Sequence, residues 1–133
     1  MVHICYRVNY IPPTDQIIDL YISEGLNRPV EDNSRIRHMF KNSNLVISAW
    51  NNDRLIGMAR SLTDFCYCCY LSDLAVREEF KNRGIGKKLI HMTKEQVGVY
   101  TTLLLLSAPT AMDYYPKMGF QKVENGFVHH RKK

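Results

Sequence analysis

Hydrophobic and polar residues change their spacing several times along the chain, and each change predicts a boundary between elements. His3 to Asn9 alternates between apolar and polar residues and predicts a short strand. Beyond Pro12-Pro13, apolar residues recur every three or four positions. This spacing predicts a helix with Thr14 as its N-cap and Gly25 at its end. A second helical face follows, made of Ile36, Met39 and Phe40.

The middle of the chain has the pattern of strands. Leu45 to Trp50 and Leu55 to Ser61 flank the turn-rich Asn51-Asn52-Asp53, and they predict a hairpin. Cys66 to Val76 is rich in Tyr, Cys, Leu and Val, which is typical of a strand that is covered on both faces.

The last part of the chain returns to helical spacing and then to strands. Gly84-Ile85-Gly86 opens a helix that ends near Gly98, and the apolar run from Thr101 to Ser107 predicts a buried, parallel strand. A short helix is expected from Pro109 or Thr110 to Gly119. A final hairpin is expected around Asn125-Gly126, with Phe120 to Val123 and Phe127 to His130 as its strands.

The predicted order is β-α-α-β-β-β-α-β-α-β-β. It predicts an α/β fold in which a mixed, mostly antiparallel sheet, flanked by helices, gains a parallel pair through the helix between Gly84 and Gly98. With 133 residues, the chain is expected to form a single domain over residues 1–133.

Composition narrows the class of protein. The longest apolar run, Leu103 to Leu106, is far shorter than the roughly 20 residues that span a bilayer, and the first residues do not resemble a signal peptide. Four cysteines, three of them within Cys66 to Cys69, are expected to be buried thiols in a reducing compartment and to bind no metal. We therefore expect a cytoplasmic protein without a membrane segment.

The most informative loop joins the Val76 strand to the next helix and reads Lys81-Asn82-Arg83-Gly84-Ile85-Gly86-Lys87-Lys88. Glycines let a backbone approach a ligand closely, and the free N–H groups of a helix N-terminus attract phosphate. The basic side chains add positive charge at the same point, within a net charge of +5. The loop has neither the Gly-Lys-Ser/Thr of a Walker P-loop nor the third glycine of a dinucleotide fingerprint. It therefore predicts a diphosphate site of another kind.

A second motif, Ala111-Met112-Asp113-Tyr114-Tyr115-Pro116-Lys117-Met118-Gly119-Phe120, follows the apolar strand. Together with the loop, it resembles the GCN5-related N-acetyltransferase (GNAT) superfamily from about Leu55 to Phe120. In that family an Arg/Gln-x-x-Gly-x-Gly/Ala loop binds the diphosphate of acetyl-CoA, and a later Tyr-x-x-x-Gly-Phe segment borders the active site. Lys81 stands where the family has Arg or Gln, which keeps a donor but loses the fork of N–H groups.

The resemblance implies that acetyl-CoA is the cosubstrate and that its pantetheine arm lies in a cleft between two splayed parallel strands. The backbone of Leu74, Ala75 and Val76 would bind that arm, and an N–H there would stabilise the oxyanion. Ala108 stands near a family Asn, so Ser107 would supply the missing hydrogen bond. The implied cofactor-binding residues are thus Leu74, Ala75, Val76, the loop from Lys81 to Lys87, Ser107 and Tyr115.

The reaction that the resemblance implies is direct attack of a primary amine on the thioester. Because such an amine is mostly protonated at neutral pH, a base must accept its proton. Tyr115 maps to the family's general acid. For the base we name Asp73, which shares a strand face with Ala75, while Tyr70 and Asp64 are alternatives. A structural Asp73 that accepts loop N–H groups or pairs with a Lys is an equally open interpretation, and His91 is expected to be a surface or packing residue.

Three function classes remain after this reading. The first is an N-acetyltransferase that acts on a small-molecule or peptide amine, and the second is a noncatalytic module that binds or senses acyl-CoA. A nucleic-acid binder is disfavoured, because the basic residues cluster at a helix start without interleaved aromatics. Fold-level analogy also implies a homodimer.

Overall fold

The computed structural model describes residues 3–132. Its elements are, in order, β1 (Ile4–Val8), α1 (Thr14–Glu24), α2 (Asn33–Lys41), β2 (Leu45–Asn51), β3 (Arg54–Thr63), β4 (Cys68–Val76), the 3₁₀ turn η1 (Glu78–Phe80), α3 (Ile85–Val97), β5 (Thr102–Leu105), and the 3₁₀ turns η2 (Pro109–Ala111) and η3 (Pro116–Met118).

The five strands form one sheet in the order β1-β2-β3-β4-β5. The first four strands pair antiparallel, whereas β4 and β5 are parallel and are connected through α3. A parallel pair needs such a crossover because a short turn cannot return the chain to the same end of the sheet. The predicted α/β class, with a mostly antiparallel sheet that gains a parallel pair through this helix, is confirmed.

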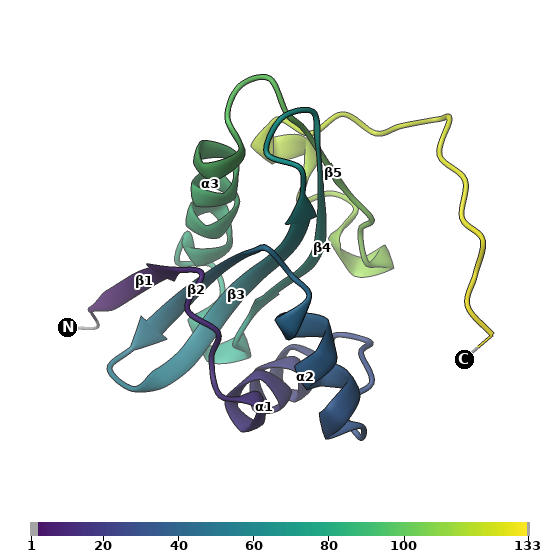
Figure 1. Ribbon diagram of the computed structural model, residues 1–133. Helices are drawn as coiled ribbons and strands as arrows, with labels where there is room; N and C mark the ends of the chain where they lie inside the picture. The colour runs from purple at the N-terminus through teal and green to yellow at the C-terminus, as the bar shows by residue number, and fades with distance from the viewer. Residues whose placement is uncertain (1–2, 133) are drawn as a thin grey trace.

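Helices cover both faces of the sheet: α3 lies on one face, and α1 and α2 lie on the other (Figure 1). Each face has its own apolar cluster. Leu89 and Ile90 of α3 pack with Ile47 and Ile56, while Leu20 of α1 belongs to the opposite cluster. Strands β2 and β3 are buried on both faces, so they form the centre of the core.

A β-bulge at Ser72 changes the direction of the side chains along β4. Arg60 pairs with Asp73 and Ser61 pairs with Leu71, which leaves Ser72 as an extra residue on β4. As a result, Leu71 belongs to the cluster under α3, whereas Asp73 faces α1.

The same bulge marks the point where β4 and β5 separate. The parallel pairing starts at Cys68 and Thr102 and ends at Leu71 and Leu105. Within residues 3–132, the part of β4 from Ser72 to Val76 has no strand beside it on that edge. The two strands therefore diverge toward their carboxyl ends, as a splayed pair would.

Three local predictions were wrong. The N-cap of α1 is Pro13 rather than Thr14, because Thr14 already has helical geometry. Side chains along β5 alternate between exposed and half-buried, since the strand lies at the edge of the sheet instead of in its centre. Of the four cysteines only Cys69 is buried, because the others lie at strand ends or on an open face.

The C-terminal elements also differ from the prediction. The expected helix before Gly119 is two separate 3₁₀ turns, η2 and η3. The hairpin expected around Asn125-Gly126 is absent, and residues 121–132 are exposed and form no helix or strand, with a bend at Glu124 and Asn125. Neither Asn125 nor Gly126 has the positive φ that a tight hairpin turn requires, so the local turn signal does not act here.

Candidate active site

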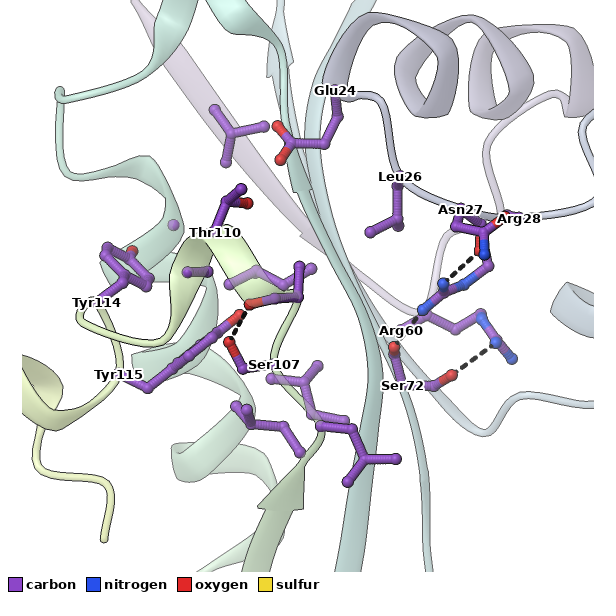
Figure 2. A pocket seen from close by; sticks show the side chains of 18 of the residues that line it. Glu24, Leu26, Asn27, Arg28, Arg60, Ser72, Ser107, Thr110, Tyr114 and Tyr115 are labelled. Atoms are coloured by element: carbon purple, nitrogen blue, oxygen red, sulfur yellow. Dashed lines mark hydrogen bonds between the residues drawn. The ribbon is translucent and has the colours of Figure 1, made fainter. Parts of the chain in front are cut away.

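A hollow of about 1420 Å³ opens where β4 and β5 separate. It is bounded by β4, the loop into α3, the carboxyl end of β5, the two 3₁₀ turns and the end of α1 (Figure 2). Most residues that the sequence assigned to cofactor binding line it: Leu74, Val76, Lys81, Asn82, Gly84, Ile85, Gly86, Lys87, Ser107 and Tyr115. The sequence therefore located one continuous site from two separate motifs.

Two residues of that assignment lie outside the hollow. Ala75 is buried on the opposite face, in the cluster under α1 and α2, because side chains alternate along β4. Arg83 is exposed, and its guanidinium carbon lies 5.2 Å from the centroid of the Phe80 ring. Neither side chain lines the hollow.

The loop before α3 turns its backbone toward the hollow. Asn82 and Gly84 have φ angles of 65° and 79°, in the left-handed region that asparagine and glycine tolerate best. No side chain among the described residues caps the start of α3, and its first turn contains no acidic residue. The first N–H groups of the helix therefore remain available to an anion, and the helix dipole favours one there.

Gly86 lies directly beneath a tyrosine that the sequence did not single out. A Cβ on Gly86 would lie 2.7 Å from the Tyr114 hydroxyl oxygen, so a side chain at this position would have to displace Tyr114 or shift the start of α3. Burial raises the pKa of Tyr114, so its hydroxyl keeps its proton beside the loop. A ligand at the start of α3 would therefore meet both backbone N–H groups and this hydroxyl.

Lys81 is held by two carboxylates. Its Nζ lies 3.0 Å from Glu24 Oε2 and 3.2 Å from Glu78 Oε2. Partial burial lowers the pKa of Lys81, but hydrogen bonds and charge from the two carboxylates outweigh burial and raise it above its ordinary value. Lys81 is thus a fixed cation at the rim of the hollow, between the end of α1 and the loop before α3.

Glu24 is the acidic side chain that sequence reasoning missed. It is the last residue of α1, and Gly25 ends the helix in a left-handed conformation, with φ of 76°. Its carboxylate is half-buried, lines the hollow and pairs with Lys81. The only signal in the sequence is a Glu directly before a helix-ending glycine, and the direction in which that end of α1 points is set by tertiary packing.

Tyr115 lies on the wall of the hollow opposite the end of α1. Its ring packs edge-on against Tyr114, with centroids 5.2 Å apart, and against Phe120, at 5.7 Å. Burial raises the pKa of Tyr115 to about 12, with further contributions from nearby Tyr114 and Glu24. The phenol therefore keeps its proton at neutral pH and is available as a donor.

Asp73 is fully buried and is held by four donors. Its carboxylate accepts hydrogen bonds from Tyr21 Oη (2.6 Å), Arg60 Nε (2.6 Å), Arg28 Nε (2.7 Å) and Ser72 Oγ (3.1 Å). Burial alone would raise the pKa of Asp73, but Arg60, Arg28 and Tyr21 outweigh burial and lower it.

This environment does not suit the general base that the sequence assigned to Asp73. A base needs access to the substrate and a carboxylate that is ready to accept a proton. Asp73 does not line the hollow, and both of its oxygens are already occupied. Its partners Arg28 and Arg60 do line the hollow, together with Ser72 (Figure 2). Asp73 therefore positions these side chains, which is a structural role, although its partners are two arginines and two hydroxyls instead of the loop N–H groups or lysine that the sequence suggested.

The comparisons with known proteins agree with this geometry. The protein-family model of the acetyltransferase (GNAT) domain matches residues 18–131, which is most of the chain. The chain belongs to the GNAT acetyltransferase family. The family expectation drawn from the two motifs is thus confirmed, and this GNAT domain is an acetyltransferase.

Relatives and solved structures extend the comparison. The GNAT domain is 29% identical over 122 residues to the uncharacterized N-acetyltransferases ycf52 of Pyropia yezoensis and Porphyra purpurea, with 82% of this chain and 68% of each relative covered. It has the fold of the probable acetyltransferase SA2161 from Staphylococcus aureus, with a TM-score of 0.80, 20% identity, and 96% of this chain and 99% of the other covered.

One similar fold was solved with CoA bound. Aminoglycoside N-acetyltransferase AAC(6')-Iy in complex with CoA has a TM-score of 0.74 and 14% identity, and the match covers 100% of this chain and 97% of that chain. At such low identity, the likeness establishes the shared fold alone.

The other residues that the sequence considered lie at different places in the GNAT domain. Tyr70 lines the hollow. Asp64 lies outside it and accepts hydrogen bonds from the N–H groups of Cys66, Tyr67 and Cys68, at 2.9, 2.7 and 3.1 Å. These bonds lower the pKa of Asp64 to about 2, which makes it the organiser of the β3–β4 turn and not a base. His91 is an exposed residue of α3, as expected.

Residues 3–132 bring no three His, Cys, Asp or Glu side chains close enough together to hold a metal ion. Over the same residues, no helix combines the length and the hydropathy that crossing a bilayer requires.

Proposed function

We propose that this GNAT enzyme transfers the acetyl group of acetyl-CoA to a primary amine of a small molecule or peptide. The amine attacks the thioester directly while both substrates are bound. One observation carries the proposal: the uncapped start of α3, Tyr115 and Glu24 all border a single hollow at the point where β4 and β5 separate.

The residues around the start of α3 fit the diphosphate of acetyl-CoA. The backbone N–H groups from Gly84 to Lys87 are donors at the positive end of the helix dipole, and the absence of a side chain at Gly86 makes room for the Tyr114 hydroxyl next to them. The Tyr114 hydroxyl adds a neutral donor beside them. Lys81 and Lys87 supply positive charge at the same rim.

The unpaired part of β4 fits the pantetheine arm. Leu74 and Val76 line the hollow along the edge that β5 has left, so their backbone groups are available to the amides of the arm. An N–H of this segment is also placed to stabilise negative charge on the thioester oxygen. Ser107 Oγ donates to the Ala108 carbonyl at 2.8 Å, and Ser107 borders the same cleft on the β5 side.

Glu24 replaces Asp73 as our proposed base. A primary amine arrives mostly as an ammonium ion, and a carboxylate that faces the hollow can bind that ion and accept its proton. The diphosphate would give Lys81 a third anion to bind besides Glu24 and Glu78, which leaves the Glu24 carboxylate available to the amine.

Tyr115 is our proposed general acid. Its phenol is protonated at neutral pH and borders the hollow on the side of the two 3₁₀ turns. As the amine nitrogen bonds to the acetyl carbon and the carbon–sulfur bond breaks, the departing thiolate takes a proton from this hydroxyl and the proton released by the amine passes through Glu24 to solvent. Tyr115 then regains a proton from solvent, because its raised pKa favours the phenol. The two side chains thus divide the acid and base roles.

The acceptor is identified with a panel of amines and an assay for the free CoA thiol. The panel contains polyamines, lysine peptides, peptide N-termini and aminoglycosides, because a neighbour with a TM-score of 0.70 was solved in complex with sisomicin. We expect thiol release with one class of amine, and mass spectrometry then gives the acetylated nitrogen. Tight binding of acetyl-CoA without thiol release from any amine would instead support the noncatalytic acyl-CoA module.

A further inference from the structure

The hollow is also lined by side chains that the proposed reaction does not use. Arg28 lies in the loop after α1, Arg60 lies on β3, and Ser72 is the bulge residue of β4. All three line the hollow, and Figure 2 shows them grouped together, away from Tyr114 and Tyr115. Because the cosubstrate is assigned to the start of α3 and to the unpaired part of β4, this group is left to the other substrate, the amine.

The two arginines share a single carboxylate. Arg28 Nε donates to Asp73 Oδ1 at 2.7 Å, and Arg60 Nε donates to Asp73 Oδ2 at 2.6 Å. Within residues 3–132, neither guanidinium has a second carboxylate within ion-pair distance. Tyr21 also donates to Asp73 but stays neutral, because burial and the Asp73 charge raise its pKa well above the ordinary value. Two positive charges thus face one negative charge, and the group keeps one positive charge in excess.

The remaining hydrogen bonds of both guanidiniums go to neutral oxygens. Arg28 donates to the carbonyls of Asn27 and Ser72, both at 2.7 Å. Arg60 donates to the hydroxyls of Ser43 and Ser72, both at 3.0 Å. These bonds hold the planes of the two guanidiniums in place. Since a guanidinium has five N–H groups, each arginine keeps further donors for a ligand in the hollow.

Burial makes the excess charge significant. The Arg60 side chain is 9% exposed, the Arg28 side chain is 24% exposed, and Asp73 is fully buried. A charge that is removed from water and lacks a partner is unfavourable, so an anion that enters the hollow gains more here than at an exposed arginine. Two fixed guanidiniums also present the fork of N–H groups that matches a carboxylate.

Other charges on the α1 and α2 side of the hollow do not cancel this excess. Arg35 and Glu31 line the same part, and both are exposed. They are one cation and one anion, so together they add no net charge. The excess therefore rests on the two arginines that share Asp73, and its size matches a ligand group with a single negative charge.

We propose that Arg28 and Arg60 form a carboxylate subsite, so that the acceptor of this GNAT enzyme is an amine that also carries a carboxylate, such as an amino acid. The inference rests on the proposed function and narrows its substrate class. Glu24 ends α1 and borders the same hollow, so the ammonium group and the carboxylate of one acceptor each meet a side chain of opposite charge. Polyamines and aminoglycosides are disfavoured, because they bring only positive charge to the two arginines.

The first test compares acids with their amides in the assay for the free CoA thiol. The acceptors are glycine, β-alanine, γ-aminobutyrate and lysine, each beside its carboxamide, which keeps the amine but has no negative charge. We expect kcat/KM to be at least about tenfold higher for one or more of the acids, which is the usual gain from hydrogen bonds to a charged group. If amines are acetylated but every amide reacts as well as its acid, the subsite is overturned while the proposed function stands.

An aminoalkylphosphonate of the same length as the preferred acid distinguishes a carboxylate from a phosphate. The phosphonate brings a larger negative charge than the single excess charge of the two arginines. We expect it to react more slowly than the acid. A phosphonate that outperforms the acid would assign the arginines to a phosphate group and overturn the carboxylate.

Arg28→Gln tests the subsite itself. The substitution removes the excess charge, while Asp73 keeps Arg60 as its charged partner and the buried pair stays balanced. We expect KM for the preferred acid to rise by about tenfold with little change in kcat, and kcat/KM for its amide to stay the same. Arg37→Gln is the matched control, since Arg37 is an exposed arginine of α2 that lies outside the hollow. An equal loss for the acid and the amide would mean that Arg28 serves only the fold, and it would overturn the subsite.

A binding measurement separates this inference from the proposed function. The N-acetyl forms of the four acids and of their amides cannot react further, so calorimetry with the CoA-saturated protein gives their affinity without turnover. We expect at least one N-acetyl acid to bind about tenfold more tightly than its amide, and the difference to vanish in Arg28→Gln. This preference without thiol release from any amine would remove the proposed function and keep the carboxylate subsite. The absence of a preference in a protein that does release thiol would remove the subsite alone.

Discussion

The Tyr114 hydroxyl oxygen lies 2.7 Å from the position that a Cβ on Gly86 would occupy. The two residues come from the two motifs that identified the family, which are separated by almost thirty positions in the sequence. Their contact joins the start of α3 to the segment between the two 3₁₀ turns. The loop before α3 and the side of the hollow that contains Tyr115 are therefore in direct contact.

This contact predicts that Gly86→Ala weakens the binding of acetyl-CoA. The new methyl group must displace Tyr114 or shift the start of α3, and we expect the dissociation constant measured by calorimetry to rise by about tenfold. Adding Tyr114→Phe removes the oxygen that the methyl group meets and should restore part of the affinity. If the double variant binds as weakly as Gly86→Ala alone, the clash is not the cause.

Removing the phenol oxygen of Tyr115 tests the general acid. Tyr115→Phe keeps the ring packing with Tyr114 and Phe120 but removes the proton donor. We expect kcat to fall by about 10²-fold, at the lower end of the usual range for acid–base groups, with little change in the affinity for acetyl-CoA. Tyr100→Phe is the matched control, because Tyr100 is exposed and lies outside the hollow. An unchanged kcat for Tyr115→Phe would remove Tyr115 from the acid role.

A pair of variants separates the base role of Glu24 from its ion pair with Lys81. Glu24→Gln and Glu78→Gln each remove one carboxylate from Lys81, but only Glu24 lines the hollow. We expect Glu24→Gln to lower kcat/KM for the amine by about 10²-fold, while Glu78→Gln changes it little. Equal losses in the two variants would mean that both act through Lys81.

The buried network around Asp73 predicts a loss of stability and not only of activity. Asp73→Asn leaves Arg28 and Arg60 without their charged partner, which should cost roughly 3–5 kcal/mol in the free energy of unfolding. Chemical denaturation measures this loss. If Asp73 were the general base instead, the variant would lose kcat while its unfolding midpoint stayed at the wild-type value.

The depressed pKa of Asp73 also fixes how that stability depends on pH. Because the pKa is lower in the folded state than its ordinary value of 3.8, the network stabilises the fold throughout the range above that value. The contribution is lost as the pH falls below about 4 toward the folded-state pKa. Wild type and Asp73→Asn should therefore converge in stability below pH 4, and a constant difference down to about pH 2 would contradict this assignment.

Sequence patterns predicted the elements whose form is set locally. The helix after Gly84 and the hairpin of β2 and β3 follow from spacing and turn residues, and the diphosphate loop follows from its glycines. The position of the bulge was invisible, because Ser72 is a residue that any strand accepts. Because the sequence did not reveal the bulge, it showed that Asp73 and Ala75 share a face of β4 but not that this face packs against α1.

Other features depend on distant parts of the chain. Glu24 became part of the site only because α1 ends beside the α3 loop, a relation that no local pattern encodes. The hairpin signal at Asn125-Gly126 failed because the flanking residues are exposed and bury no face, and an isolated two-stranded hairpin is at best marginally stable in water.

The single extra residue in β4 also has a consequence for the evolution of this domain. A bulge bends its strand and increases the local twist, so deleting Ser72 is expected to straighten β4 while Leu74 and Val76 stay on the face of α3. The straighter strand would lie closer to the chain that follows β5, which narrows the hollow without interrupting the sheet. A change of a single codon at this position thus adjusts the width of the opening.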